Sequence, residues 1–204
     1  VQRHWKRKER LLVYRMAKVF LYLFYPLYAL VTTPKGVDTS SPIIVSLTTF
    51  PARIDKVHLV IHTLLRQRRR PAKIQLWLAE TQFPDRKLPQ KLLRLEKYGL
   101  EIRYCDDLRS HKKYYYAMKE NPDLTIVTAD DDMLYPESWL CKMVETGKRH
   151  PEAIVCMLAY QISCDMNGTP IPYNQWPGPV EEVMFPQADL LPIGCEGVLY
   201  PPHS

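Results

Sequence analysis

The sequence contains little glycine and none of the short motifs that commonly bind phosphates or carry a serine nucleophile. Only 7 of the 204 residues are glycine, against 18 prolines, and no G-x-G-x-x-G, G-x-x-x-x-G-K or G-x-S-x-G occurs. The 5 cysteines are odd in number and form no C-x-x-C pair. We therefore expect reduced core thiols in a reducing compartment, not a disulfide framework or a zinc site.

An excess of charge is also missing from most of the chain. The formal net charge is +6, and residues 1–18, with seven basic and one acidic side chain, account for all of it. The remaining residues hold 21 basic and 21 acidic side chains. The high isoelectric point therefore describes the N-terminal segment, and a nucleic-acid-binding face is not predicted.

No apolar run is long enough for an obvious membrane span. The uncharged run Val19–Pro34 is interrupted by Pro26, whereas a spanning helix needs about 20 apolar residues. The run is rich in tyrosine, which suits the bilayer interface, and the basic residues before it would attract anionic lipid. We predict that residues 1–36 anchor the protein peripherally at the inner, cytoplasmic face of the membrane. A packed terminal helix and a true span are the alternatives.

Residues 37–204 are predicted to form one α/β domain. Apolar patterns at alternating strand and helix spacing predict strands over 42–50, 73–80, 100–107, 123–132 and 152–163, and helices over 55–70, 89–99, 110–122 and 136–151. Ser110 and Pro136 suit the start of the last two helices. This alternation predicts a mostly parallel twisted sheet with helices on both faces, with the proline-rich remainder packed over one edge. Since the chain begins with Val and stops at YPPHS, we also expect that it could be a truncated piece.

Polar side chains gather at three predicted strand ends. They are Ser46, Thr48 and Thr49, then Asp106 and Asp107, then Asp130, Asp131 and Asp132. Because the carboxyl ends of parallel strands meet at one edge of a sheet, these groups should converge. Three adjacent carboxylates repel each other and need a cation. Oxygen ligands suit Mg²⁺ or Mn²⁺, which completes its shell with phosphate oxygens and water. The pattern favours a metal-bridged diphosphate site over a solvated acidic turn.

Basic residues near these ends could meet a diphosphate. Lys112 and Lys113 begin a predicted helix, and Arg53 follows the first strand. A solvated helix face is the alternative for both lysines. His58 and His62 do not form a zinc-protease motif, because Leu59 stands where that motif needs glutamate.

The segment TADDDMLYP, between a strand and a helix, resembles the D-x-D region of the GT-A glycosyltransferases. It is most similar to the family-2-like enzymes of bacterial cell-surface polysaccharide synthesis. VSLTTFPARI, DLRSHKKYYYAM and GCEGVLYPP resemble further segments of that group in the same order, so the resemblance covers roughly residues 42–202. It implies a GT-A fold and transfer of a sugar from a UDP- or GDP-linked donor to a glycan or lipid-linked acceptor, with Mn²⁺ or Mg²⁺.

The resemblance also implies roles for individual residues. Ser46, Thr48, Arg53 and Asp106 would line the nucleotide pocket, and Lys113 would approach the diphosphate. Asp130 and Asp132 would contact metal and ribose, with Asp131 between them in the cofactor site. Asp132 and Glu196 are the candidate catalytic carboxylates.

Two departures from the family pattern leave alternatives open. Glu196 replaces a glycine of the family's GxGGVLYP, and no later acidic motif supplies a general base before Ser204. A catalytically inactive nucleotide-sugar-binding module is therefore the first alternative. A metal-dependent nucleotidyltransferase or phosphohydrolase is the second.

Overall fold

The computed structural model describes residues 23–180, 183 and 185–204. The chain divides into two compact units, Val1–Pro34 and Lys35–Ser204. In the first unit residues 23–31 are helical, and the basic head predicted over residues 1–18 lies outside the described part. No helix among the described residues has both the length and the apolar character needed to cross a bilayer.

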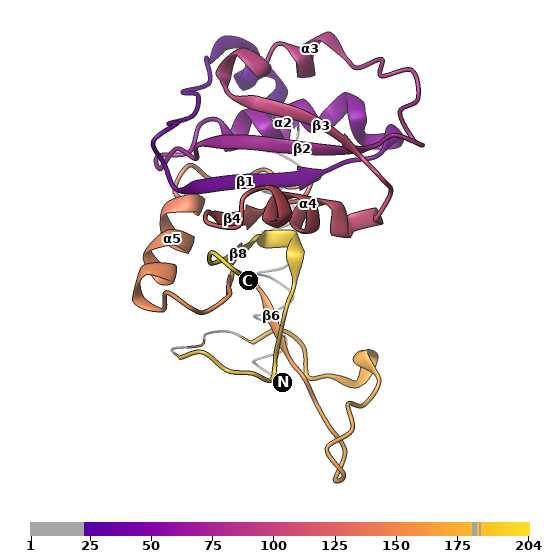
Figure 1. The fold of residues 1–204 in the computed structure, drawn as a ribbon, viewed down its shortest axis with the longest axis vertical. Helices are drawn as coiled ribbons and strands as arrows, with labels where there is room; N and C mark the ends of the chain where they lie inside the picture. The colour runs from indigo at the N-terminus through magenta and orange to yellow at the C-terminus, as the bar shows by residue number, and fades with distance from the viewer. Residues whose placement is uncertain (1–22, 181–182, 184) are drawn as a thin grey trace. The chain divides into compact units, whose positions relative to one another are not determined.

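The second unit is built on a six-stranded, mostly parallel sheet with the order β3-β2-β1-β4-β8-β5 (Figure 1). Four strands are parallel: β1 (Ile43–Thr48), β2 (Lys73–Ala79), β3 (Leu100–Cys105) and β4 (Thr125–Thr128). β8 (Val198–Tyr200) inserts antiparallel between β4 and β5 (Val155–Cys156). A separate antiparallel pair is formed by β6 (Ala159–Gln161) and β7 (Leu190–Pro192).

Among the residues of this unit that the structure describes, four α-helices and five 3₁₀ helices connect the strands. The α-helices are α2 (Ile54–Leu64), α3 (Gln90–Leu93), α4 (Lys112–Glu120) and α5 (Trp139–Arg149). The 3₁₀ helices are η1 (Pro51–Arg53), η2 (Glu96–Tyr98), η3 (Arg109–His111), η4 (Tyr173–Gln175) and η5 (Gly194–Glu196).

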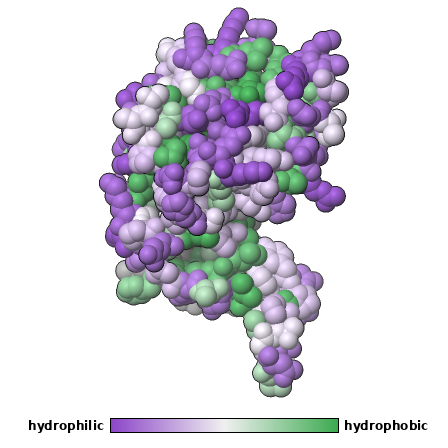
Figure 2. All heavy atoms as spheres, in the orientation of Figure 1, coloured by the Kyte–Doolittle hydropathy of each residue, from purple (hydrophilic) through white to green (hydrophobic). Residues whose placement is uncertain are grey.

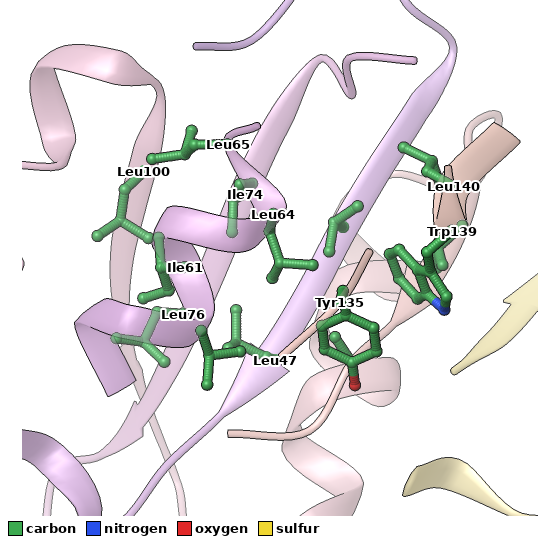
Figure 3. Packing of buried hydrophobic residues seen from close by; sticks show 14 of the residues in the cluster. Leu47, Ile61, Leu64, Leu65, Ile74, Leu76, Leu100, Tyr135, Trp139 and Leu140 are labelled. Carbon is green, nitrogen blue, oxygen red and sulfur yellow. The ribbon is translucent and has the colours of Figure 1, made fainter. Parts of the chain in front are cut away.

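Helices cover both faces of the sheet because β1 alternates between two apolar layers. Ile43, Val45 and Leu47 point into the larger core, which Figure 3 shows between the sheet and α2, with Tyr135 and Trp139 beside it. The intervening Ile44 packs with Ala117 of α4 on the other face. Burial of alternate residues on opposite faces is what a central strand requires. The predicted mostly parallel sheet with helices on both faces is confirmed.

The ends of two helices differ from the sequence prediction, and Gln67 explains both. The helix predicted over 55–70 stops at Leu64, because the buried Gln67 side chain turns toward α5. Its Nε2 donates to the Pro136 carbonyl (2.9 Å), and its Oε1 accepts the Leu140 N–H (3.0 Å). This cap lets α5 begin at Trp139, so the prediction that Pro136 lies in its first turn was wrong.

Three further predictions were also wrong in detail. Ser110 does not cap α4, which begins after η3 without a side-chain cap. The single strand predicted over 152–163 is divided into β5 and β6, which belong to different sheets. The sequence did not predict β8 as a strand, although it inserts beside β4.

Candidate nucleotide and metal site

The predicted site residues lie at the carboxyl ends of the parallel strands. β1, β2 and β4 run in the same direction, and the residues that follow them include Thr49, Arg53 and Asp130–Asp132. Figure 1 shows this edge at the arrowheads of β1 and β2, where α4 begins. The Ala129 N–H donates to the Ser46 carbonyl (2.9 Å). This bond continues the pairing of β1 and β4 up to the acidic loop, defined here as Asp130–Asp132.

Asp131 has both carboxylate oxygens bound by the protein. Thr49 Oγ1 donates to Oδ2 (2.6 Å), and Arg53 Nη1 donates to Oδ1 (2.6 Å). The Asp131 side chain is only 8% exposed. The hydrogen bond to Asp131 raises the pKa of Arg53, and the charges of the acidic loop add to this effect. Asp131 therefore fixes the loop against β1 and η1 rather than facing solvent as a metal ligand.

Asp130 forms an ion pair with Lys113 at the start of α4. Lys113 Nζ contacts Asp130 Oδ1, and the lysine side chain is 11% exposed. The Lys113 carbonyl accepts the hydroxyl of Ser46, which in turn accepts a hydrogen bond from Trp77 Nε1 (3.1 Å). Ser46 is fully buried, so it positions Lys113 and does not itself reach a pocket.

The acidic loop is thus partly neutralised by cations of the same chain. Arg53 Nη1 also contacts Asp132 Oδ2 (3.1 Å), so each aspartate pairs with Arg53 or Lys113, and two cations face three carboxylates. In water such pairs stabilise modestly, but here they relieve repulsion between neighbouring carboxylates. The positive groups beside the acidic loop are therefore Arg53 and Lys113 of the same chain.

The donor set also fits a shared divalent cation. The Asp130 and Asp132 side chains are 30% and 49% exposed, which leaves both carboxylates accessible from solvent. Within residues 23–180, 183 and 185–204 no three His, Cys, Asp or Glu side chains are grouped to hold a metal alone. Mg²⁺ needs only one or two carboxylates when phosphate oxygens and water complete its shell. Asp130 and Asp132 are suited to such a site, whereas Asp131 is not.

Glu196 is brought to the acidic loop by two buried aromatic residues. The Tyr135 hydroxyl accepts the Asp130 N–H (2.8 Å) and donates to the Cys195 carbonyl (3.3 Å). Trp139 Nε1 donates to the Glu196 carbonyl (2.8 Å), and the Tyr135 and Trp139 rings lie 4.4 Å apart. Tyr135 therefore links η5 to the acidic loop, and Trp139 links η5 to α5.

The pKa of the Cys195 thiol agrees with the proximity of η5 to the acidic loop. Burial raises the pKa of the Cys195 thiol, and the charges of Glu196, Asp130 and Asp132 raise it further. Burial also raises the pKa of Tyr135 well above its usual range, so its hydroxyl stays protonated and can donate. Neither residue was identified from the sequence. The only signal for Tyr135 was its position just after the acidic residues, within LYP.

Asp106 and Asp107 form a second group at the same edge. Asp107 accepts from Lys112 Nζ (2.6 Å), from the Arg109 N–H (2.8 Å) and from Gln82 Nε2 (2.9 Å). The Lys112 hydrogen bond is the first cause that lowers the pKa of Asp107. Lys112 is thus buried as a partner of Asp107 and does not lie on a solvated helix face.

The predicted nucleotide-pocket residues Thr48 and Asp106 lie near Trp77. Thr48 Oγ1 donates to the Trp77 carbonyl (2.8 Å), and the Tyr116 ring stacks on the Trp77 ring (5.3 Å). Tyr116 also donates to the Asp106 carbonyl (3.4 Å), while the Asp106 side chain is exposed. No hydrogen bond in the described part of the chain joins Asp106 to the acidic loop. The structure therefore brings together Arg53, Lys113, Glu196 and the loop, with Asp106 in a neighbouring group.

Removing the Tyr135 hydroxyl should show how much the stability of the acidic loop depends on it. In Tyr135→Phe the Asp130 N–H loses its acceptor in a buried position, which costs about 1–3 kcal/mol of unfolding free energy. Chemical denaturation measures this loss. Tyr114→Phe is the control, because its hydroxyl contacts only the exposed His111 in the described chain. An equal loss in both variants would contradict a special role for Tyr135.

Sequence comparisons give no match for this chain, and a structure comparison gives only distant similarity. No protein-family model matches it, and no curated protein sequence matches it. Among solved structures, it is similar to the mannosyltransferase PcManGT from Pyrobaculum calidifontis, in complex with GDP-Man and Mn²⁺. That similarity has a TM-score of 0.42 at 14% sequence identity, and it covers 72% of this chain and 45% of the mannosyltransferase chain.

Proposed function

We propose that this protein is a glycosyltransferase, of hexosyltransferase type, that transfers a sugar from a nucleoside-diphosphate donor with the help of Mn²⁺ or Mg²⁺. The observation that carries the proposal is the acidic loop at the carboxyl edge of the sheet, compensated by Arg53 and Lys113. The site contains both carboxylates and cationic side chains. A divalent cation could replace the cationic side chains as partner of the carboxylates, and a diphosphate could replace the carboxylates as partner of the cationic side chains. The four ordered segments that resemble GT-A enzymes support the same assignment.

Asp130 and Asp132 would hold the metal. A bound divalent cation supplies charge neutralisation on the leaving diphosphate. Asp131 stays hydrogen-bonded to Thr49 and Arg53, and so holds Asp130 and Asp132 at a fixed spacing.

Lys113 and Arg53 would bind the phosphates. Both already lie against the acidic loop, so a donor diphosphate can replace a carboxylate as their partner with little movement. Ser46 holds the backbone of Lys113 in place during this exchange. Their contribution is mainly positional, because a fixed diphosphate orients the sugar carbon toward the acceptor.

A carboxylate near the loop would take the proton of the acceptor hydroxyl. The acceptor oxygen forms the new bond to the sugar carbon, the bond from that carbon to the phosphate oxygen breaks, and the electron pair leaves with the nucleoside diphosphate. Asp132 and Glu196 are the two candidates, because the Tyr135 hydroxyl bonds both to the Asp130 N–H and to the Cys195 carbonyl of η5. A carboxylate that binds a cation is a weaker base, so Glu196 is the candidate that stays available when Asp132 holds the metal.

The acceptor would be a glycan or a lipid-linked glycan of a cell-surface polysaccharide. We propose that the basic, tyrosine-rich segment before residue 37 holds the protein peripherally at the inner face of the membrane, where lipid-linked acceptors are concentrated. The apolar side chains of Leu23, Leu27 and Leu30 in the helix over residues 23–31 are exposed, which supports this placement.

Calorimetric titration of the protein with UDP or GDP, with and without Mn²⁺, tests the donor site. We expect Mn²⁺-dependent binding that is lost in Asp130→Ala. Lys56→Ala, which changes an exposed residue without a hydrogen bond in the described chain, serves as the control. Binding in Asp130→Ala equal to that of the parent would overturn the site assignment.

Donor hydrolysis then separates a transferase from a binding module. Slow release of free sugar from a nucleotide-sugar in the presence of Mn²⁺ is expected of an active transferase, because water can replace the acceptor. Nucleotide binding without any turnover would instead support the inactive module. Cleavage between the phosphates would identify a phosphohydrolase.

A further inference from the structure

A cluster of arginine residues lies at the edge of the sheet opposite the candidate site. α2 begins at the carboxyl edge and runs back to Leu64, so the residues after it lie where the strands start. The Ala72 N–H donates to the Ile43 carbonyl (2.7 Å), at the first residue of β1. The arginine patch is defined here as Arg66, Arg68, Arg69 and Arg70, with Lys35 beside them. The six residues of β1 separate this edge from the site, which corresponds to about 20 Å.

The patch has more positive charge than its acidic neighbours neutralise. Glu137 pairs with Lys35 Nζ (2.6 Å) and with Arg66 Nη2 (2.9 Å), and these bonds lower its pKa. Asp38 accepts from Ser40 Oγ (2.7 Å), and the charge of Arg70 contributes a smaller part to its lowered pKa. Two carboxylates therefore face five basic side chains.

The surplus charge is presented to solvent by two residues. Arg68 and Arg70 are exposed, and no salt bridge of either side chain occurs among the described residues. The Arg68 N–H donates to the Glu137 carbonyl (2.8 Å), so the backbone of the patch is fixed although its charged ends are open. A fixed backbone with open guanidinium groups suits a phosphate-bearing surface.

The N-terminal segment joins the domain at this patch. The N–H groups of Lys35 and Gly36 donate to the Leu65 carbonyl (3.1 and 3.2 Å), one residue before Arg66. The segment that ends at Pro34 contributes the sequence's whole net charge of +6 through its first 18 residues. The patch therefore lies where the tail is connected to the domain.

We propose that the arginine patch binds the anionic headgroups of a membrane surface. The partner is chosen by charge and by continuity. Outside the patch, residues 19–204 hold more acidic than basic side chains, and the tail that joins at Lys35 combines basic and apolar residues. The proposal goes beyond the proposed function, which gives membrane contact to the N-terminal segment alone. It orients the domain, since lipid at the patch places the carboxyl edge of the sheet one strand length from the headgroups.

Sedimentation of the full chain with vesicles tests the proposal. One set of vesicles is phosphatidylcholine alone, and the other also contains phosphatidylserine. Each basic residue near an anionic surface strengthens binding by about fivefold, so Arg68→Gln combined with Arg70→Gln should weaken binding to the anionic vesicles by roughly 25-fold. The tail is the same in both proteins, so their ratio reports on the patch. Raised salt should reduce the difference.

The control removes the same charge from the opposite edge. Lys56 and Lys87 are both exposed and follow the carboxyl ends of β1 and β2, so Lys56→Gln combined with Lys87→Gln should weaken vesicle binding less than about twofold. An equal loss in the two double variants, or no loss in the arginine variant, would overturn the proposal. Stronger binding of the parent to an RNA or DNA oligonucleotide than to vesicles, lost with Arg68 and Arg70, would also overturn it and assign the patch to nucleic acid. Mn²⁺-dependent nucleotide binding should be unchanged in the arginine variant, which keeps this test separate from that of the site.

Discussion

Replacing Asp132 with asparagine is expected to weaken the Mn²⁺-dependent binding of a nucleoside diphosphate by about 100-fold and to leave stability nearly unchanged. The Asp132 side chain is 49% exposed, and its pair with Arg53 spans 3.1 Å. An exposed pair of this kind contributes about 0–1 kcal/mol to folding. A neutral amide is a poorer ligand than a carboxylate for a hard cation, so the loss should appear in binding. Calorimetric titration and chemical denaturation measure the two effects separately.

Asp131→Asn is the matched comparison, and its effects should be reversed. Both Asp131 oxygens accept hydrogen bonds from Thr49 and Arg53, and the side chain is 8% exposed. Loss of hydrogen bonds to a buried charged group should lower the free energy of unfolding by about 1.5–3 kcal/mol. In the folded protein, nucleotide binding should weaken less than in Asp132→Asn. If Asp131→Asn were stable but lost nucleotide binding, Asp131 would be the ligand and the assignment of the two residues would be exchanged.

Gly197→Ala should be among the most destabilising single substitutions in the second unit. Gly197 has φ +107, a conformation that L-residues rarely adopt, and an added Cβ would lie 2.6 Å from Trp139 Cζ2. Backbone strain and overpacking together should lower the free energy of unfolding by about 2–5 kcal/mol. Trp139 cannot easily move away, because it is buried and its Nε1 is bound to the Glu196 carbonyl.

Gly168→Ala provides the control for Gly197→Ala. Gly168 has φ +79 and nothing within 4 Å of an added Cβ, so it reports backbone strain alone. Its cost should therefore be about 1 kcal/mol. Thermal or chemical unfolding of both variants would reveal the steric contribution as their difference. Equal costs would show that Trp139 adapts, and that η5 is held less firmly than the contacts indicate.

The sequence predicted the middle of the fold better than its end. From residue 43 to residue 149 most strands and helices are long enough to show their periods, and predicted apolar positions of α2, such as Val57 and Ile61, are buried as expected. The helix predicted over 89–99 is the exception, because it is divided into α3 and η2. β5 has two residues and β8 has three. Strands this short carry no readable alternation, and the place of β8 depends on distant pairing with Thr128.

The site was predictable as a location but not as a network. The clustered acids after β4 were predicted to lie at the carboxyl edge of the sheet, and they do, because parallel strands share their carboxyl ends. Which carboxylate is committed to the protein could not be predicted, since it depends on Thr49 and Arg53 approaching from another strand end. The link between the acidic loop and η5 depends on a hydrogen bond from Tyr135 to Cys195, which lies 60 positions later in the sequence. The local sequence cannot show such a contact.

That distance along the chain has a consequence for the order of folding during synthesis. β1 to β4 and Arg53 are all made before residue 129, so Asp131 can meet its partner as soon as β4 pairs with β1. The contact from Tyr135 to Cys195 closes a loop of 60 residues, and closing such a loop has its own entropic cost. A nascent chain can thus pair β1 with β4 and place Arg53 and Lys113 against the acidic loop, while Glu196 has yet to be added. The ion pairs of Arg53 and Lys113 would keep this intermediate from exposing three unpaired carboxylates until β8 is made and joins the sheet.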